Sequence, residues 1–323
     1  MIEVNPSSTS IVAERSTSLQ KDILRTLLYF DIFHHPLTVK EIYSFLPSNS
    51  TTQAAVEQAC SNGPLQGLVV RDGTYVRLRD AQENVFADRR SKESRAKRML
   101  QIATLMSRLI RRFPFVRGVF LSGELSKGVA SEHSDIDFVI VAAEGRLWIC
   151  RTFLILFKKI FLFNKKRFFC LNHFVTAGHL EAEDRSVYTA TEIATLRPLF
   201  NYELFKRYQH ANEWIKEYLP NASAVAQDSF HKENDTSFLQ RFLEALIPPF
   251  VADRLDPRLL SYWKTMWRRR YPELTDDQRS RLFRSSFYLS TAYGQDFLTQ
   301  ILKSYRNRLE QFRLLPTDRG HSN

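Results

Sequence analysis

Two aspartates separated by one residue are the side chains best placed to do chemistry in this chain. Asp135 and Asp137 lie in the segment Ser134–Val141 (SDIDFVIV), whose apolar second half predicts a β-strand. Side chains of a strand alternate between its two faces, so both carboxylates are expected to point the same way. Neighbouring carboxylates repel each other, and a cation that prefers oxygen ligands relieves the repulsion. The pair therefore predicts a site for Mg²⁺ or Mn²⁺.

A segment with two glycines precedes the aspartates. Apolar residues 119–121 predict a strand, and Gly123–Gly128 (GELSKG) predicts a tight loop directly after it. The chain has only 10 glycines, and Gly118 lies just upstream of these two. Such loops present backbone N–H groups that bind anions. A phosphate-sized concavity is therefore expected beside the two carboxylates.

These two segments together resemble the polymerase β-like nucleotidyltransferases, in which a glycine loop is followed by Asp-hydrophobic-Asp on a strand. Gly123, Gly128 and Ser134–Val141 carry the resemblance, which covers Ile102–Val175. It implies transfer of a nucleoside monophosphate from an NTP to an acceptor hydroxyl or phosphate, with release of pyrophosphate. Asp135 and Asp137 would hold Mg²⁺, which clamps the attacking and leaving oxygens of an in-line displacement. The acceptor, whether small molecule, protein or RNA, is not determined by these motifs.

The resemblance also implies a nucleotide site around the glycine loop. Its residues are Ser122, Gly123, Glu124, Ser126, Lys127, Gly128 and Ser134, with backbone N–H groups around the triphosphate. Glu124 departs from the family pattern, which has a serine at that position. Its carboxylate must turn outward or join the metal, because it would otherwise repel the phosphates. Ser134 is expected to orient the entry to the strand.

The family places a third carboxylate on the third strand, as the base for the attacking hydroxyl. The third strand expected here, Phe168–Val175, has Asn172 and His173 instead. One of them should face the aspartates, since neighbours on a strand face opposite ways. His173 can accept a proton, whereas Asn172 can only hydrogen-bond or ligate weakly. His173 is therefore the predicted catalytic base, and the acidic loop Glu181–Asp184 lies near enough in sequence to reach the site.

The sequence pattern divides the chain into four parts. Residues 1–18 are a polar lead-in, 19–85 a winged-helix-like unit, 86–185 the nucleotidyltransferase-like core, and 186–323 an α-helical C-terminal region. The expected fold is α/β (α+β) in the core. Helical spacing predicts a helix within 86–117 and a crossover helix over 145–163, which should pack on the sheet rather than lie on a membrane. A long polar loop is expected over 221–237.

Capping and turn signals predict the winged-helix-like unit. Thr38 and Glu41 form a capping box, Gln53–Cys60 predicts a third helix, and Asp72-Gly73 predicts the turn of a hairpin. Such units often bind DNA, but 19–85 has six Lys and Arg against seven acidic residues, and the third helix has no cation. Because phosphate neutralisation dominates DNA affinity, this unit is not expected to bind DNA.

Composition sets the broad class. The 323 residues carry a formal net charge of +11, which favours an anionic partner such as a nucleotide or RNA. Residues 86–117 contribute a net +8 of it. Cys60, Cys150 and Cys170 are far apart and in apolar settings, as expected of free thiols in a reducing compartment. No stretch is long and apolar enough to span a membrane, so a cytoplasmic protein is expected.

Two functions other than catalysis stay open from the sequence. One is a catalytically weak or inactive relative that binds nucleotide and acts through the winged-helix-like unit. The other is a DNA-binding regulator in which the α/β core is only a platform. Metal-dependent turnover of NTP would separate an enzyme from both.

Overall fold

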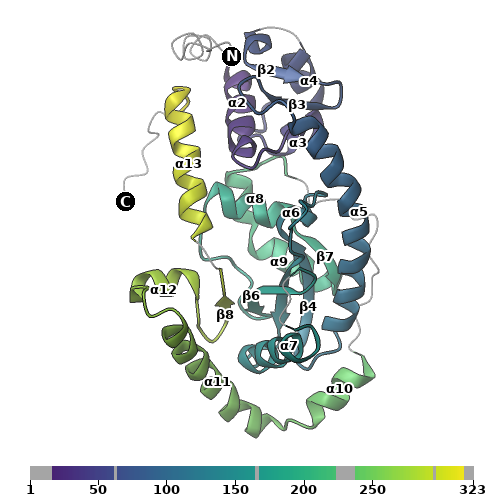
Figure 1. The fold of residues 1–323 in the computed structure, drawn as a ribbon, viewed down its shortest axis with the longest axis vertical. Coiled ribbons are helices and arrows are strands. Elements are labelled where there is room, and N and C mark those ends of the chain that lie inside the picture. Colours follow the sequence, from purple (N-terminus) through teal and green to yellow (C-terminus); the bar gives the residue numbers. More distant parts are fainter. Residues whose placement is uncertain (1–16, 62–63, 164–166, 223–236, 294–295, 316–323) are drawn as a thin grey trace.

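The computed structural model describes residues 17–61, 64–163, 167–222, 237–293 and 296–315. In these residues the protein is mixed α/β, with a small antiparallel sheet in an N-terminal unit and a mixed five-stranded sheet at the centre (Figure 1). Most of the expected lead-in, 1–18, and most of the expected loop, 221–237, lie outside the described residues.

The N-terminal unit has the predicted order of helices followed by a hairpin. Its elements are α2 (Ser18–Asp31), β1 (Leu37–Thr38), α3 (Val39–Ser44), α4 (Gln53–Ser61), the 3₁₀ turn η1 (Pro64–Gly67), β2 (Val69–Arg71) and β3 (Tyr75–Leu78). Thr38 and Glu41 form the predicted capping box at α3. The hairpin is also confirmed, because β2 and β3 pair antiparallel across a turn in which Gly73 has a φ of +90°.

The central sheet has the strand order β7-β4-β5-β6-β8. Its first elements in the chain are α5 (Val85–Ile110), β4 (Val116–Ser122), the helical turn α6 (Gly123–Ser126) and β5 (Asp137–Ala142). Helix α7 (Leu147–Phe161) then crosses to β6 (Cys170–Thr176), so β5 and β6 are parallel, whereas the other neighbouring strands are antiparallel. The predicted crossover helix and third strand are confirmed.

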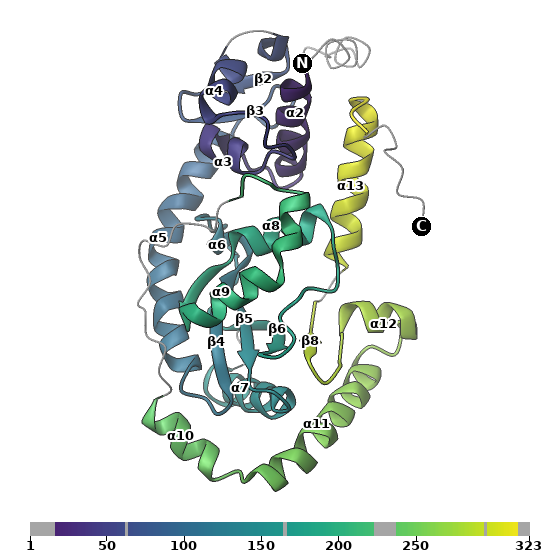
Figure 2. The same cartoon turned by 180° about the vertical axis from the view of Figure 1, so that it is seen from behind.

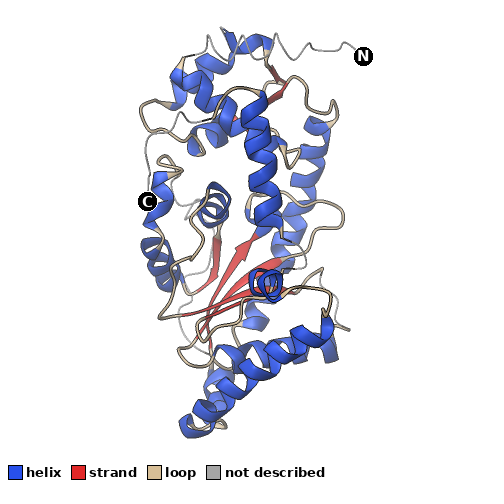
Figure 3. Ribbon diagram, turned by 90° about the vertical axis from the view of Figure 1, so that its left-hand side faces the viewer, coloured by secondary structure: helices blue, strands red, loops and turns tan. Residues whose placement is uncertain are grey.

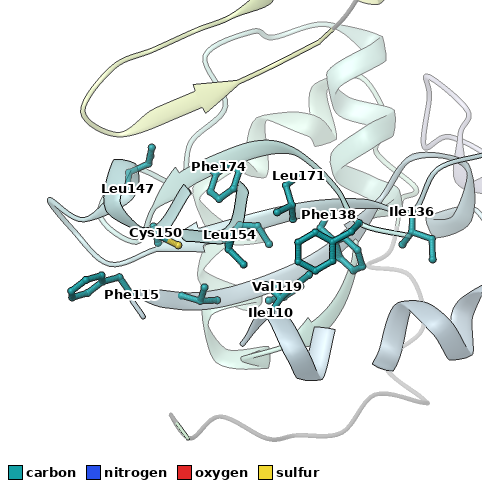
Figure 4. Packing of buried hydrophobic residues seen from close by; sticks show 14 of the residues in the cluster. Ile110, Phe115, Val119, Ile136, Phe138, Leu147, Cys150, Leu154, Leu171 and Phe174 are labelled. Atoms are coloured by element: carbon teal, nitrogen blue, oxygen red, sulfur yellow. The ribbon is translucent and has the colours of Figure 1, made fainter. Parts of the chain in front are cut away.

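Each face of the central sheet has its own hydrophobic core, because side chains of β5 alternate between the faces. Phe138 packs with Ile110 of α5 and Leu154 of α7 in the core that Figure 4 shows. Val139 points the other way and packs with Phe205. The helices α8 (Val187–Thr195) and α9 (Tyr202–Ala211) cover this second face (Figure 2). Figure 3 shows the central strands, in red, among the helices.

The segment after residue 185 is not purely helical, contrary to the sequence prediction. Strands β7 (Arg197–Phe200) and β8 (Leu289–Thr291) form the two edges of the central sheet. The sequence pattern predicts helices throughout 186–323, but Pro198 lacks an N–H group and suits an edge strand instead. The other elements are η2 (Glu213–Glu217), α10 (Phe238–Ala245), α11 (Pro249–Arg270), α12 (Asp276–Leu282) and α13 (Phe297–Gln311).

The last helix returns to the N-terminal unit. Leu309 of α13 is buried in the core of that unit, and Arg308 forms an ion pair with Asp31 of α2. Arg25 of α2 donates to the carbonyl oxygen of Leu314 at 3.1 Å. The two ends of the described chain therefore pack together. Within the ranges that the structure describes, no helix is both long and apolar enough to cross a lipid bilayer.

Candidate active site

The two aspartates lie where the chain enters β5. The strand begins at Asp137 rather than at Ser134, but the preceding residues already run beside the segment that leads into β6. Ile136 donates to the carbonyl oxygen of Arg167 at 2.9 Å and accepts from the N–H of Cys170 at 3.1 Å. The side chain of Ile136 is fully buried, whereas Asp135 and Asp137 are half-buried. This alternation leaves both carboxylates on the side away from the Ile136 core.

Asp137 packs directly against Gly123, which follows the last residue of the neighbouring strand β4. Ser122 of β4 is paired with Asp137 of β5, so the turn α6 begins beside the carboxylate. A Cβ atom added to Gly123 would lie 2.6 Å from Oδ2 of Asp137, closer than any ordinary contact. Gly123 also has a φ of +71°, which disfavours residues with a side chain. Both requirements explain why glycine stands here.

The surroundings of Asp137 favour its neutral form. Burial is the main cause that raises the pKa of Asp137 to about 6. A hydrogen bond with the Cys170 thiol lowers it, whereas the charges of Asp135 and Glu192 raise it further. Cys170 in turn accepts from the amide of Asn172, at 2.9 Å between Nδ2 and Sγ. The charges of Asp135 and Glu192 repel an ionised Asp137, and a bound cation would relieve this repulsion.

Glu192 is a carboxylate that the sequence reasoning missed. It lies on α8 and forms an ion pair with Lys127, at 2.7 Å between Oε1 and Nζ. Lys127 also donates to the carbonyl oxygen of Gly123 at 3.2 Å, so it connects α8 to the turn α6. One sequence signal was present, because Glu192 is the one charged residue in the otherwise uncharged helix Val187–Thr195.

The predicted glycine loop is a helical turn, and its polar side chains bind one another. Glu124 accepts from the N–H and hydroxyl of Ser131 and from the hydroxyl of Ser134. Burial alone would raise the pKa of Glu124, but these hydrogen bonds outweigh it and lower the pKa. The hydroxyl of Ser126 is buried and donates to the carbonyl oxygen of Gly123 at 2.8 Å. Glu124 is thus turned toward the Ser131–Ser134 segment.

His173 does not stand beside Asp137 along the sheet. A register shift in β6 places Cys170 opposite Asp137 and His173 opposite Val139. Nδ1 of His173 lies 2.8 Å from the hydroxyl of Tyr293. Desolvation, with smaller contributions from nearby arginines, lowers the pKa of His173 to about 4. The imidazole is therefore neutral at physiological pH.

A cavity of about 410 Å³ extends from Asp137 between β6, α8 and the segment around β8. Among the predicted site residues, those that line it are Ser122, Gly123, Asp137 and His173, together with Asn172. Asp135, Glu124, Ser126, Lys127, Gly128 and Ser134 are not among its lining residues. The cavity has the size of a small-molecule site. The side chains that the structure adds to it include Tyr188, Glu192, Arg281, Arg284 and Tyr293.

The acidic loop that was expected to reach the aspartates is engaged elsewhere on this cavity. Arg284 forms ion pairs with Glu183 at 3.1 Å and with Asp184 at 2.7 Å. Glu181 forms an ion pair with Arg185 at 2.6 Å. These carboxylates are therefore neutralised by arginines.

The donors at Asp135 and Asp137 fit a hard divalent cation. Carboxylate oxygens are the ligands that Mg²⁺ prefers, and it is commonly bound by one or two carboxylates together with substrate phosphates. Across the described parts of the chain, no group of three His, Cys, Asp or Glu side chains is arranged to hold a metal ion.

Comparisons of the chain with protein-family models, with curated proteins and with solved structures found no match.

Proposed function

We propose that this protein is a nucleotidyltransferase that uses Mg²⁺ or Mn²⁺ to transfer a nucleoside monophosphate from an NTP to an acceptor. One observation carries the proposal: the carboxylate of Asp137 is seated on Gly123, beside Asp135 and at the edge of the cavity. Asp137 begins β5, and the glycine turn follows directly after β4, the antiparallel neighbour of β5.

We also propose family-level assignments for two parts of the fold. The succession of α5, β4, α6, β5, α7 and β6 supports a nucleotidyltransferase-like core, and α2 to β3 support a winged-helix-like unit. The proposal also includes a cytoplasmic location, for which the support is that Cys60, Cys150 and Cys170 are all buried free thiols.

Asp135 and Asp137 would hold the cation, which supplies charge neutralisation for the phosphates and the departing pyrophosphate. The residues around them fix the position of the Asp137 side chain. Gly123 leaves the space that this carboxylate occupies, and the Cys170 thiol binds it from the neighbouring strand. Their common effect is to hold the carboxylate in place before substrate arrives.

His173 and Glu192 are the groups proposed to take the proton of the acceptor. Both line the cavity that Asp137 borders. When Nδ1–H of His173 donates to the Tyr293 hydroxyl, Nε2 keeps a free lone pair. The low pKa keeps the imidazole neutral but makes it a weak base. Glu192 is the second candidate, and its carboxylate forms an ion pair with Lys127.

The proposal is tested by incubating the full chain with each common NTP, Mg²⁺ or Mn²⁺, and fractions of small molecules, RNA or proteins as acceptors. Pyrophosphate release should require the metal and should be lost in Asp135→Asn and in Asp137→Asn. Asp88→Asn, which changes an exposed carboxylate on α5, is the matched control and should behave as the unmodified protein. Turnover that persists in both site variants would contradict the proposal.

A nucleotide-binding protein without transferase activity is the second candidate. The observation in its favour is that Lys127 and Ser126, which the resemblance assigns to the phosphates, already bind Glu192 and the carbonyl oxygen of Gly123. In that case metal-dependent NTP binding would be measured without release of pyrophosphate, and would still be lost in Asp137→Asn.

A further inference from the structure

Three helices gather at the end of the molecule that lies opposite the N-terminal unit. Figures 1 and 2 both show α7, α10 and α11 at this end. Helix α11 is fixed to α7, because Asp256 accepts from the N–H groups of Trp148 and Ile149 at 2.9 Å each. Trp263 of α11 donates to Thr152 of α7 at 2.9 Å.

Helix α10 is attached by its polar face and exposes its apolar face. Gln240 is fully buried and donates to the carbonyl oxygen of Val116 at 2.6 Å. Glu244 accepts from the N–H of Phe115 at 2.6 Å. On the other side, Phe238, Phe242 and Leu246 are 84%, 53% and 64% exposed at i, i+4 and i+8. A helix that packs on a protein core in water has the reverse arrangement.

The outer face of α7 is apolar as well. Phe153, Leu156 and Ile160 follow one another at helical spacing and are 38%, 49% and 55% exposed. The chain before β4 connects this face to α10, because Phe113 packs edge-on against Phe157 of α7. Two residues later, Phe115 binds α10 as described above. The exposed apolar rows of α7 and α10 therefore flank one segment, 113–117.

Helix α11 continues the exposed row and adds positive charge to it. Phe250 is 61% exposed, and Arg254 and Arg258 follow it on the same side at intervals of four residues. Lys159 is exposed beside Ile160 on α7. In the sequence, 145–180 contains seven Lys and Arg and no acidic residue. The carboxylates of α10 and the first half of α11 are engaged, since Glu244 binds Arg117, Asp253 binds Arg146, and Asp256 is buried.

We propose that the outward faces of α7, α10 and the first half of α11 form a surface that binds anionic lipid membranes. Apolar side chains of this surface would enter the boundary between headgroups and acyl chains, while Lys159, Arg254 and Arg258 contact anionic headgroups. The sequence prediction that the crossover helix packs on the sheet is confirmed for its inner face, where Trp148 and Leu154 are buried. Its outer face is the part assigned to the membrane.

The charge around the surface favours a membrane over a second copy of the chain. In a symmetric dimer the same patch meets itself, so Lys159, Arg254 and Arg258 would face like charges. A bilayer that contains anionic lipids offers the opposite charge and an apolar interior at once. Large exposed apolar patches with a charged rim are typical of such interaction sites.

The test is flotation of the full chain with vesicles of phosphatidylcholine alone and with vesicles that also contain phosphatidylglycerol. We expect binding to the anionic vesicles, and weaker binding as salt is raised from about 0.1 to about 1 M. The affinity of the double variant Ile160→Glu, Phe242→Glu for anionic vesicles should be lower by roughly tenfold or more, because binding scales with inserted apolar area. Phe287→Glu, which changes a phenylalanine of 61% exposure elsewhere, should bind like the unmodified protein.

Circular dichroism shows whether each variant is folded, and sedimentation velocity shows whether it dimerises. Flotation that is absent with both kinds of vesicle, or equal for all variants, would overturn the proposal. It would also be overturned if the unmodified chain dimerised and the double variant did not, since a second copy would then be the occupant. NTP turnover plays no part in these measurements, so their failure would leave the proposed function untouched.

Discussion

Replacing Gly123 by alanine probes the contact on which the candidate site is built. The new Cβ atom would lie 2.6 Å from Oδ2 of Asp137, whereas Cγ and Cβ of Asp137 would lie at 3.4 and 3.5 Å. Only the carboxylate oxygen is in serious conflict, so the aspartate side chain must move. We therefore expect Gly123→Ala to displace Asp137 and to abolish metal-dependent nucleotide binding.

The chain offers a matched control that separates this clash from backbone strain. Gly145 has a φ of +63°, close to the +71° of Gly123, but an added Cβ atom would have no neighbour within 4 Å. Both alanine variants should lose roughly 1–2 kcal/mol of stability for a side chain at positive φ. Gly123→Ala should lose about 1–3 kcal/mol more, as overpacked interiors do. Effects of alanine on the unfolded chain cancel in the comparison.

A double-mutant cycle shows whether the additional loss comes from Asp137. In the background Asp137→Ala the carboxylate is gone, so Gly123→Ala should cost no more than Gly145→Ala. Urea denaturation of the single and double variants measures the coupling, which we expect to be about 1–3 kcal/mol. The reasoning would be refuted if Gly123→Ala and Gly145→Ala were equally stable and both bound NTP with metal.

Three further predictions follow from charges and pKa values. The pKa of Asp137 rises from 3.8 to about 6 on folding, so the free energy of unfolding should fall as pH rises through that interval. Asp137→Asn should therefore be more stable than the unmodified protein by roughly 1–3 kcal/mol at neutral pH. Equal melting temperatures would contradict this. The pKa of His173 falls from 6.5 to about 4, so stability should decline as pH drops through that interval, and His173→Asn should lack this decline in urea denaturation. Fluorescence anisotropy of the full chain with duplex DNA should show only non-specific binding at physiological salt, because residues 19–85 include more acidic than basic side chains. Tight, sequence-specific binding would refute this prediction.

Local signals in the sequence predicted the elements that depend on neighbouring residues. The capping box at Thr38 and the hairpin turn at Gly73 are both present as expected. The failures lie where long-range pairing overrides local pattern. Strand β7 was interpreted as helix because its edge position depends on pairing with β4, which is remote in sequence. Helix α11 continues through Pro257, where a proline would ordinarily interrupt a helix, and Asp256 binds it to α7.

At the candidate site, the strand pattern indicated that Asp135 and Asp137 share a side, and the burial of Ile136 between them agrees with this. The position of Glu192 could not be predicted, because α8 reaches the site only through the packing of the sheet. The same holds for the partner of His173, since Tyr293 comes from the chain after β8. The one-residue register shift in β6 has no sequence signal of its own, yet, with Cys170 opposite Asp137, it places His173 rather than Asn172 opposite Val139.

The most direct test of the central claim is the fate of label from ATP marked at the α- or the γ-phosphate, with Mg²⁺ and an acceptor fraction. We expect α-label to move to the acceptor and γ-label to leave in pyrophosphate, and we expect neither event in Asp137→Asn. Transfer of γ-label to the acceptor, or equal transfer of α-label by Asp137→Asn, would contradict this expectation.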